Sequence, residues 1–90
     1  MLHIIAYDIA SDKRLRRVAR ICEDYGFRME KSVFECDLED REFEKFWKRL
    51  SQSVADADMV IDYPIPQFCR GRIRVLGAPR RETPPPTLVF

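Results

Sequence analysis

The residue best placed to do chemistry in this sequence is an aspartate that closes an apolar strand. Residues 2–10 are rich in Ile and Tyr and mostly apolar on both faces, which predicts a buried central strand that ends at Asp8 or just beyond it. A carboxylate there would lie at the edge of a sheet. The pattern leaves three roles open for Asp8: a metal ligand, a cap for the following helix, or an ion-pair partner of Arg14 or Arg17.

A basic run follows directly. Residues 13–20 hold five basic groups and no acid, and residues 70–81 hold five more, whereas residues 35–58 hold eight carboxylates against four basic groups. This segregation predicts one positive and one negative face in a chain whose formal charge is only +1. A dipolar surface of this kind suits a polyanion. Positions 14, 17 and 20 lie on one stripe of the helix, and position 16 lies on a different side of it. Some of these arginines are therefore expected to be only solvent-exposed residues of the helix surface.

Other catalytic chemistries lack their residues. His3 is the only histidine and lies inside the first strand, where we expect it to be half-buried rather than a general base. The three cysteines, Cys22, Cys36 and Cys69, are odd in number and have no CxxC spacing, which argues against a disulfide framework and a zinc site and favours a reducing cytoplasm. There is no Gly-rich phosphate loop and no HExxH motif. The apolar start of about six residues is too short for a signal sequence or a membrane span.

Two amphipathic helices are expected around an alternating segment. Ser11 can cap a helix with apolar residues at steps of three and four, and Gly26 is its stop signal. Residues 27–38 alternate, with Phe34 on one side and Glu35 on the other, as one bent strand or as a hairpin that turns near Lys31. Asp40 is the expected N-cap of the second helix, whose apolar residues are Phe43, Phe46, Trp47, Leu50 and Val54.

The remaining chain predicts strands at 59–65 and 72–76 and then an arm with three consecutive prolines that ends in an apolar tetrad, 87–90. We therefore expect residues 1–78 to form one α+β domain, a ferredoxin-like βαββαβ sandwich with an extra C-terminal strand, and residues 79–90 to form an extended arm. Both helices would cover one face of the sheet. The other face needs a cover, so we expect a symmetric homodimer, with the arm docking on the partner copy or on another subunit.

At this point the sequence resembles the CRISPR-associated protein Two family. The resemblance covers roughly residues 2–78 and rests on four motifs in order: Tyr7-Asp8-Ile9, the basic helix with Arg17, Ser32-Val33-Phe34-Glu35, and Ile73-Arg74-Val75-Leu76-Gly77. It implies a nucleic-acid-binding homodimer that works with the CRISPR integrase in spacer acquisition. Some members are metal-dependent endonucleases on RNA or DNA, and others are structural adaptors.

The resemblance implies specific residue roles. Asp8 is the catalytic and metal-binding residue, paired with its copy across the two-fold axis, where Mg²⁺ would relieve the repulsion between two carboxylates. Arg17 and Arg28 match basic positions of the family near the aspartate. With Arg14 and Arg16 they form the expected nucleic-acid-binding set, for duplex DNA and single-stranded RNA. Phe34 is expected to pack in the core or a dimer interface more readily than to stack on a base.

Three alternatives stay open. An architectural adaptor that bridges integrase dimers on DNA and never cuts would need the same basic surface and the same dimer. A toxin-type ribonuclease would share the fold. An RNA-recognition-motif domain is disfavoured, because the alternating aromatics typical of its central strands are missing.

Overall fold

The computed structural model describes residues 1–77, whose order of elements is βαββαβ. The strands are β1 (Leu2–Asp8), β2 (Phe27–Glu30), β3 (Val33–Asp37) and β4 (Met59–Ile65). The helices are α1 (Asp12–Tyr25) and α2 (Asp40–Ser51), and a 3₁₀ helix, η1 (Gln67–Arg72), follows β4. Residues 27–38 thus form a hairpin that turns at residues 31 and 32, the second of the two arrangements that the alternation allowed.

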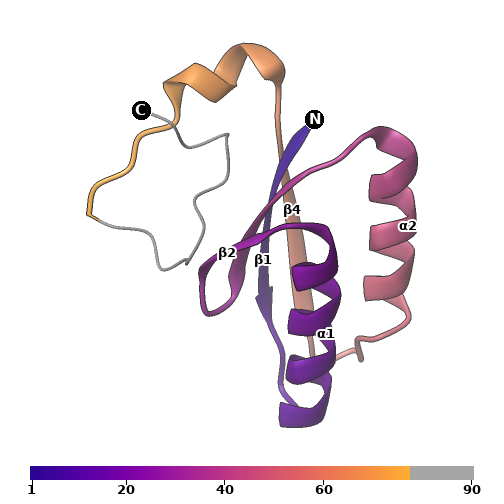
Figure 1. Ribbon diagram of the computed structural model, residues 1–90. Coiled ribbons are helices and arrows are strands. Elements are labelled where there is room, and N and C mark those ends of the chain that lie inside the picture. The colour runs from indigo at the N-terminus through magenta and orange to yellow at the C-terminus, as the bar shows by residue number, and fades with distance from the viewer. Residues whose placement is uncertain (78–90) are drawn as a thin grey trace.

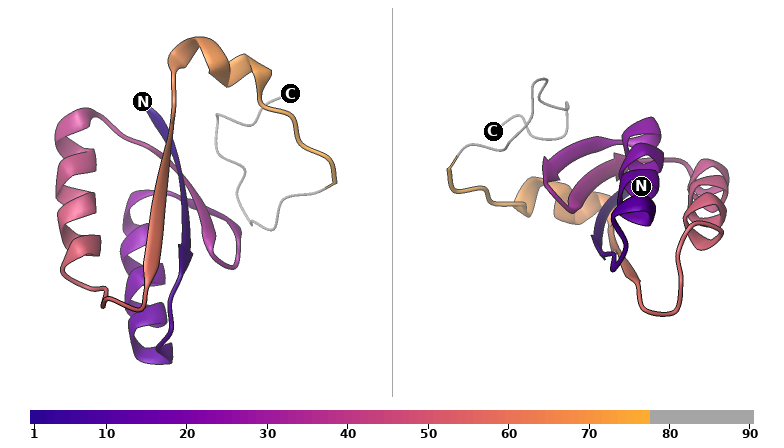
Figure 2. Two further views of the ribbon diagram at one scale, coloured as in Figure 1. Left: turned by 180° about the vertical axis from the view of Figure 1, so that it is seen from behind. Right: turned by 90° about the horizontal axis from the view of Figure 1, so that it is seen from below.

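The four strands form one antiparallel sheet in the order β2-β3-β1-β4. Both helices lie on the same face of this sheet, and the opposite face carries no helix of the βαββαβ unit (Figures 1 and 2). The predicted ferredoxin-like α+β class is therefore confirmed. None of the helices within residues 1–77 is both long and apolar enough to cross a bilayer.

Helix α1 is bounded as its sequence predicts. The Ser11 side chain accepts a hydrogen bond from the Arg14 amide at 3.3 Å, and the Gly26 amide donates to the Cys22 carbonyl at 2.9 Å. A side chain at Gly26 would collide with the Glu35 carbonyl oxygen and Cys36 Sγ. A glycine at this position therefore allows the end of α1 to pack directly on β3.

The core lies between the sheet and the two helices. Ile5, Phe34 and Cys36 of the sheet and Val18 and Cys22 of α1 are fully buried, and Phe46 and Leu50 of α2 close the cluster. Burial raises the pKa of the Cys22 and Cys36 thiols to about 12, so both stay protonated at neutral pH. These two cysteines are core residues rather than nucleophiles or metal ligands, in agreement with their spacing.

Four local predictions are wrong. Val54, expected in the second helix, lies beyond its end at Ser51, and His3, expected to be half-buried, is buried. Asp40 is the first residue of α2 rather than its N-cap, a position that Glu39 occupies without a side-chain cap hydrogen bond. The strand expected at 72–76 is also absent, because Arg72 ends η1 and residues 73–77 form no strand. The alternation of Ile73 and Val75 favours a strand, but a strand also needs a hydrogen-bonded neighbour.

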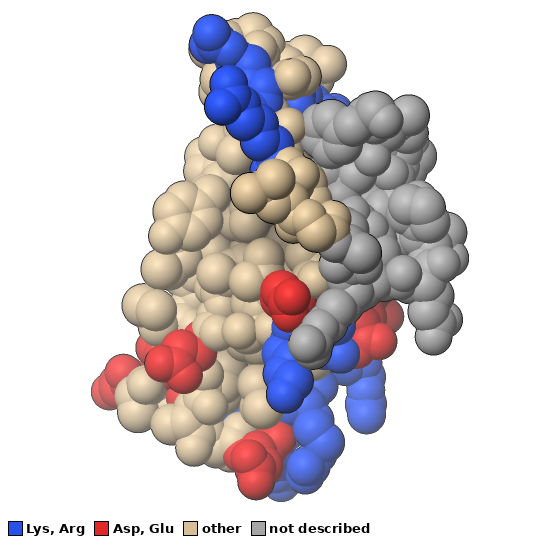
Figure 3. Space-filling view, turned by 90° about the vertical axis from the view of Figure 1, so that its left-hand side faces the viewer, with Lys and Arg blue, Asp and Glu red and all other residues tan. Residues whose placement is uncertain are grey.

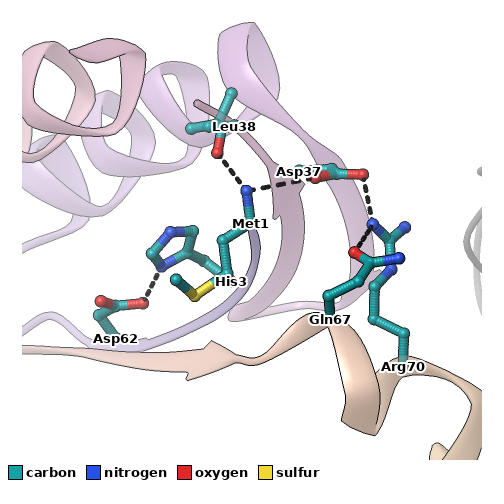
Figure 4. Close-up of polar contacts among 7 residues, drawn as sticks. All are labelled: Met1, His3, Asp37, Leu38, Asp62, Gln67 and Arg70. Carbon is teal, nitrogen blue, oxygen red and sulfur yellow. Dashed lines mark hydrogen bonds and ion pairs between the residues drawn. The ribbon is translucent and has the colours of Figure 1, made fainter. Parts of the chain in front are cut away.

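The segment after β4 is directed away from the sheet by η1. Arg70 of η1 contacts Asp37 at the end of β3 at 3.1 Å and lies beside Gln67 (Figure 4). Residues 73–77 therefore leave the domain without pairing to either edge strand of the described sheet. The arm at 79–90 and its apolar tetrad at 87–90 lie outside the described residues, so their docking remains a prediction.

Candidate functional site

Asp8 is the last residue of β1 and pairs in register with Met59, the first residue of β4. Its side chain is exposed and forms no hydrogen bond or ion pair with any other residue of the described range, 1–77. The two structural roles that the sequence left open go to other groups. Ser11 caps α1, and the guanidinium of Arg14 binds Asp58. Asp8 is thus a carboxylate that the fold places at the end of a central strand and leaves available.

A cavity of about 420 Å³ lies beside Asp8. It is bounded by the end of β1, the first turns of α1 and the β2–β3 hairpin, with the lining residues Tyr7, Asp8, Ile9, Leu15, Arg16, Ala19, Arg28, Lys31 and Ser32. Three basic residues, Arg16, Arg28 and Lys31, therefore line the same cavity as Asp8, and Arg28 also pairs with Glu23 at 3.9 Å. Such a site attracts the phosphates of a nucleic acid.

The floor of this cavity positions Arg28. The ring of Phe34 is wholly buried, and the Arg28 guanidinium carbon lies 5.1 Å from its centroid. The Tyr7 hydroxyl donates to the Lys31 carbonyl at 3.1 Å, which holds the hairpin turn against β1, and burial raises the pKa of Tyr7. Phe34 is therefore a core residue beneath Arg28, which is one of the roles expected for it, and its ring is not exposed for base stacking.

Arg14 lies apart from this cavity and is occupied by Asp58. Its Nε donates to Asp58 Oδ2 at 2.7 Å and its second terminal nitrogen donates to Oδ1 at 3.1 Å. Asp58 also accepts the Ala10 and Ala55 amides at 2.9 and 2.8 Å. The bond from Arg14, followed by those two amides, holds the pKa of Asp58 well below its usual range. Arg14 thus ties α1 to the α2–β4 loop, and its expected contact with nucleic acid has no support here.

Arg17 is also separated from Asp8. It lines a second cleft, between α1 and α2, together with Arg20 and Arg49. Of the four expected nucleic-acid ligands, only Arg16 and Arg28 lie in the cavity beside Asp8, and Lys31 is a third cation there that the sequence reasoning missed. Lys31 lies at the predicted turn of the hairpin, and this position was the feature of the sequence that could have identified it as a site residue.

One chain does not build a metal site by itself. Among the described residues there is no group of three His, Cys, Asp or Glu side chains that could hold a metal ion. Asp8 supplies a single hard oxygen ligand, which suits Mg²⁺ in kind but not in number. A second Asp8 from another copy, with water and phosphate oxygens, would be required to complete the shell.

The fold and this cavity define a small α+β domain in which Asp8, Arg16, Arg28 and Lys31 line one cavity. The family model described as CRISPR associated protein Cas2 matches residues 1–73. The chain is 35% identical over 88 residues to "CRISPR-associated endoribonuclease Cas2 1" of Chloroflexus aurantiacus, covering 96% of this chain and 90% of that protein. It is 34% identical over 89 residues to "CRISPR-associated endoribonuclease Cas2 3" of a Synechocystis strain, covering 98% and 97%.

Solved structures agree with the sequence relatives. The crystal structure of Streptococcus pyogenes Cas2 at pH 6.5 superimposes with a TM-score of 0.74 at 35% identity, over 86% of this chain and all of that one. This chain belongs to the CRISPR-associated Cas2 family. The resemblance seen in its motifs is thereby confirmed, and its role is CRISPR-associated.

Proposed function

We propose that this chain is a homodimeric CRISPR adaptation subunit that binds nucleic acid and hydrolyses phosphodiester bonds with Mg²⁺ at Asp8. The observation that carries the proposal is the free Asp8 carboxylate in a cavity with Arg16, Arg28 and Lys31. The names of the relatives in Chloroflexus and Synechocystis, both endoribonucleases, support the same reaction class.

The open face of the sheet supports the dimer. Side chains that alternate with the buried ones point to this face, where Tyr63 and Met59 are each 51% exposed. The strand pairing places seven apolar residues on this face beside two buried ones, Leu2 and Glu35: Ile4, Ala6, Val33, Met59, Ile61, Tyr63 and Ile65. Figure 3 views this side of the molecule, where a broad uncharged area lies between charged groups at its two ends. An apolar sheet face of this kind is well suited to a second copy of the same face.

The same register places Asp8 on the open face, since it alternates with Ala6 and Ile4 along β1. Two open faces that pack about a two-fold axis would bring two Asp8 carboxylates toward each other. This arrangement would supply the second carboxylate that a single chain lacks, and a bound Mg²⁺ would offset the repulsion between the two.

The residues of the cavity then have separate tasks. Arg16, Arg28 and Lys31 hold and orient the phosphate backbone, and the core ring of Phe34 fixes the guanidinium of Arg28. Asp8 would hold the metal ion. The ion itself, when bound, supplies charge neutralisation on the phosphate and a water of lowered pKa.

Asp8→Asn is the direct test, because it removes a charge at nearly constant shape. Purified wild type, Asp8→Asn and the matched variant Asp56→Asn, an exposed aspartate in the loop before β4, are compared on labelled RNA and duplex DNA with Mg²⁺ or with chelator. We expect Asp8→Asn to lower cleavage by at least about 100-fold and Asp56→Asn to leave it unchanged. Undiminished Mg²⁺-dependent cleavage by Asp8→Asn would reject Asp8 as the site.

A second function is favoured by the lack of a three-ligand metal cluster among residues 1–77. In that case the dimer is an architectural adaptor between integrase subunits on DNA. The two functions are distinguished by the wild-type protein. An adaptor binds duplex DNA but cleaves neither RNA nor DNA with any divalent cation.

A further inference from the structure

The helical layer contains a second basic cleft that the proposed active site does not use. It has a volume of about 310 Å³ and lies between α1 and the end of α2, lined by Arg17, Arg20, Ile21, Arg49, Gln52 and Ser53. It shares no lining residue with the cavity beside Asp8. Helix α1 separates the two, with Arg16 on one flank and Arg17 on the other.

The guanidinium groups of this cleft are not neutralised. Arg17 and Arg20 are exposed, stand one helical turn apart, and form no ion pair with any residue of the described range. Arg49 has one carboxylate partner, Asp24, at 3.3 Å. Three guanidiniums thus face one carboxylate. Like charges three positions apart destabilise an isolated helix slightly, so this arrangement favours an anion from outside the chain.

Arg49 is held in position by its neighbours. The bond to Asp24 fixes one side of its guanidinium, whose central carbon lies 5.6 Å from the centroid of the Tyr25 ring. Arg49 therefore enters the cleft with part of its conformational freedom already removed. A held guanidinium binds phosphate at a smaller entropic cost than a free side chain does.

The carbonyl oxygens at the end of α2 are largely hydrogen-bonded, so few are left bare to repel an anion in the cleft. A helix C-terminus normally exposes carbonyl oxygens, but four of the last five in α2 each accept a hydrogen bond. The Ser51 and Ser53 hydroxyls bond the Trp47 and Arg49 carbonyls at 2.8 and 2.9 Å. The Gln52 and Ser53 amides bond the Lys48 and Leu50 carbonyls at 3.1 and 2.9 Å. The cleft therefore presents mainly guanidiniums rather than bare carbonyls.

We propose that the α1–α2 cleft is a second binding site for backbone phosphates, so that a nucleic acid seated at Asp8 crosses α1 and is held again by Arg17, Arg20 and Arg49. This inference rests on the proposed nucleic-acid-binding function. An α-helix with its side chains is about 10–12 Å wide, and phosphates along one strand of B-DNA advance about 3.4 Å each. The two sites flank this one helix, so a strand that passes over α1 can reach both.

The test compares two double variants that each remove two positive charges. Arg17→Gln/Arg20→Gln removes the cleft, and Arg41→Gln/Lys45→Gln removes charges from the outer face of α2, where Asp40 and Glu44 surround them. Affinity for a labelled random duplex is measured by fluorescence anisotropy over a range of salt concentrations without divalent cation. Circular dichroism checks that both variants fold.

We expect the cleft variant to bind about tenfold more weakly at low salt and its log–log salt slope to fall by about 0.9 for each phosphate that it no longer binds, whereas the α2 variant keeps the wild-type slope. Equal slopes for the two variants would overturn the inference and leave the Asp8 proposal standing. If wild type binds no duplex, the cleft inference is overturned, and the Asp8 proposal is still decided by the cleavage assay on RNA. If the slope of the cleft variant falls while Asp8→Asn still cleaves, the cleft stands and the Asp8 assignment fails.

Discussion

Two aspartates at the same end of the sheet have opposite surroundings. Asp8 ends β1, and Asp58 directly precedes β4, whose first residue pairs with Asp8. The Asp58 side chain is fully buried and accepts four hydrogen bonds, two from Arg14 and two from backbone amides. The Asp8 side chain is exposed and bonds no described residue.

The difference in surroundings indicates a structural role for Asp58 and leaves Asp8 available to bind a ligand. Asp58 ties the β1–α1 loop to the α2–β4 loop and so fixes the place where β1 ends. A carboxylate with all its acceptor sites filled cannot also bind a metal ion. Asp8 keeps its acceptor sites, and the neighbouring Asp58 network fixes the backbone that carries it. In the candidate site, Asp58 thus supports the backbone, and Asp8 carries the free carboxylate.

Removal of the buried carboxylate gives the largest effect. Asp58→Asn leaves the Arg14 guanidinium without its charged partner and is expected to lower the melting temperature by more than about 10 °C. Asp8→Asn removes the same charge from the exposed position and is expected to shift it by less than about 3 °C. Thermal melts followed by circular dichroism measure both. Equal shifts would show that the two aspartates do not differ in role.

Low pH tests the structural role of Asp58 through its effect on folding stability. The pKa of Asp58 is lowered in the folded protein by Arg14 and the two amides, from an ordinary value of 3.8. The stabilisation from a lowered pKa is complete above the unfolded-state pKa and is lost as the pH falls below it toward the folded-state pKa. Wild type should therefore lose stability below about pH 4, and Asp58→Asn should lose less. Parallel loss in both proteins would contradict the Asp58 network.

Much of the fold follows from periodicity, because apolar spacing and caps are local signals. The Ser11 cap, the Gly26 stop, the two helices and β1 are set by residues within a few positions of one another. The strand expected at 72–76 fails for the complementary reason. Its alternation is a local signal, but pairing depends on a neighbour, and η1 directs the segment away from both edges.

The site was predictable only in part. Asp8 was singled out because it closes an apolar strand, and its metal-binding role was implied by the family resemblance and stays a prediction. The distinct roles of Arg14, Arg16 and Arg17 were not, because all three belong to one basic run and differ only in what lies opposite them in space. Asp58 lies 44 positions from Arg14, in a loop with no motif. Contacts of this range have no signature in a single sequence.

Arg14 and Arg16 provide a second comparison between a structural residue and a predicted ligand-binding residue, with smaller expected effects. Arg14→Gln removes the partner of Asp58 and is expected to lower the melting temperature by about 5 °C or more without changing the salt slope of duplex binding. Arg16→Gln, in the cavity beside Asp8, is expected to do the reverse and to lower that slope by about 0.9. Thermal melts and anisotropy titrations measure the two effects. A lowered salt slope for Arg14→Gln would restore Arg14 as a phosphate ligand.

The smallest expected effect belongs to Asp8 and concerns the dimer. Two carboxylates about 4 Å apart in water repel by about 1 kcal/mol, equivalent to about fivefold in a dissociation constant. Without divalent cation, Asp8→Asn should therefore dimerise about fivefold more tightly than wild type. Added Mg²⁺ should tighten the wild-type dimer and leave Asp8→Asn unchanged at matched ionic strength. Sedimentation equilibrium measures both, and Asp56→Asn is the matched control for loss of one exposed charge.

The direction of this change distinguishes a paired carboxylate from any other exposed one. An Asp8 far from the two-fold axis would give the same dissociation constant in wild type and in Asp8→Asn, with or without Mg²⁺. An Asp8 that stabilises the interface, as Asp58 stabilises its loops, would give weaker dimers in the variant. Only two carboxylates that face each other give a tighter dimer when one charge per chain is removed, because repulsion between like charges is then relieved.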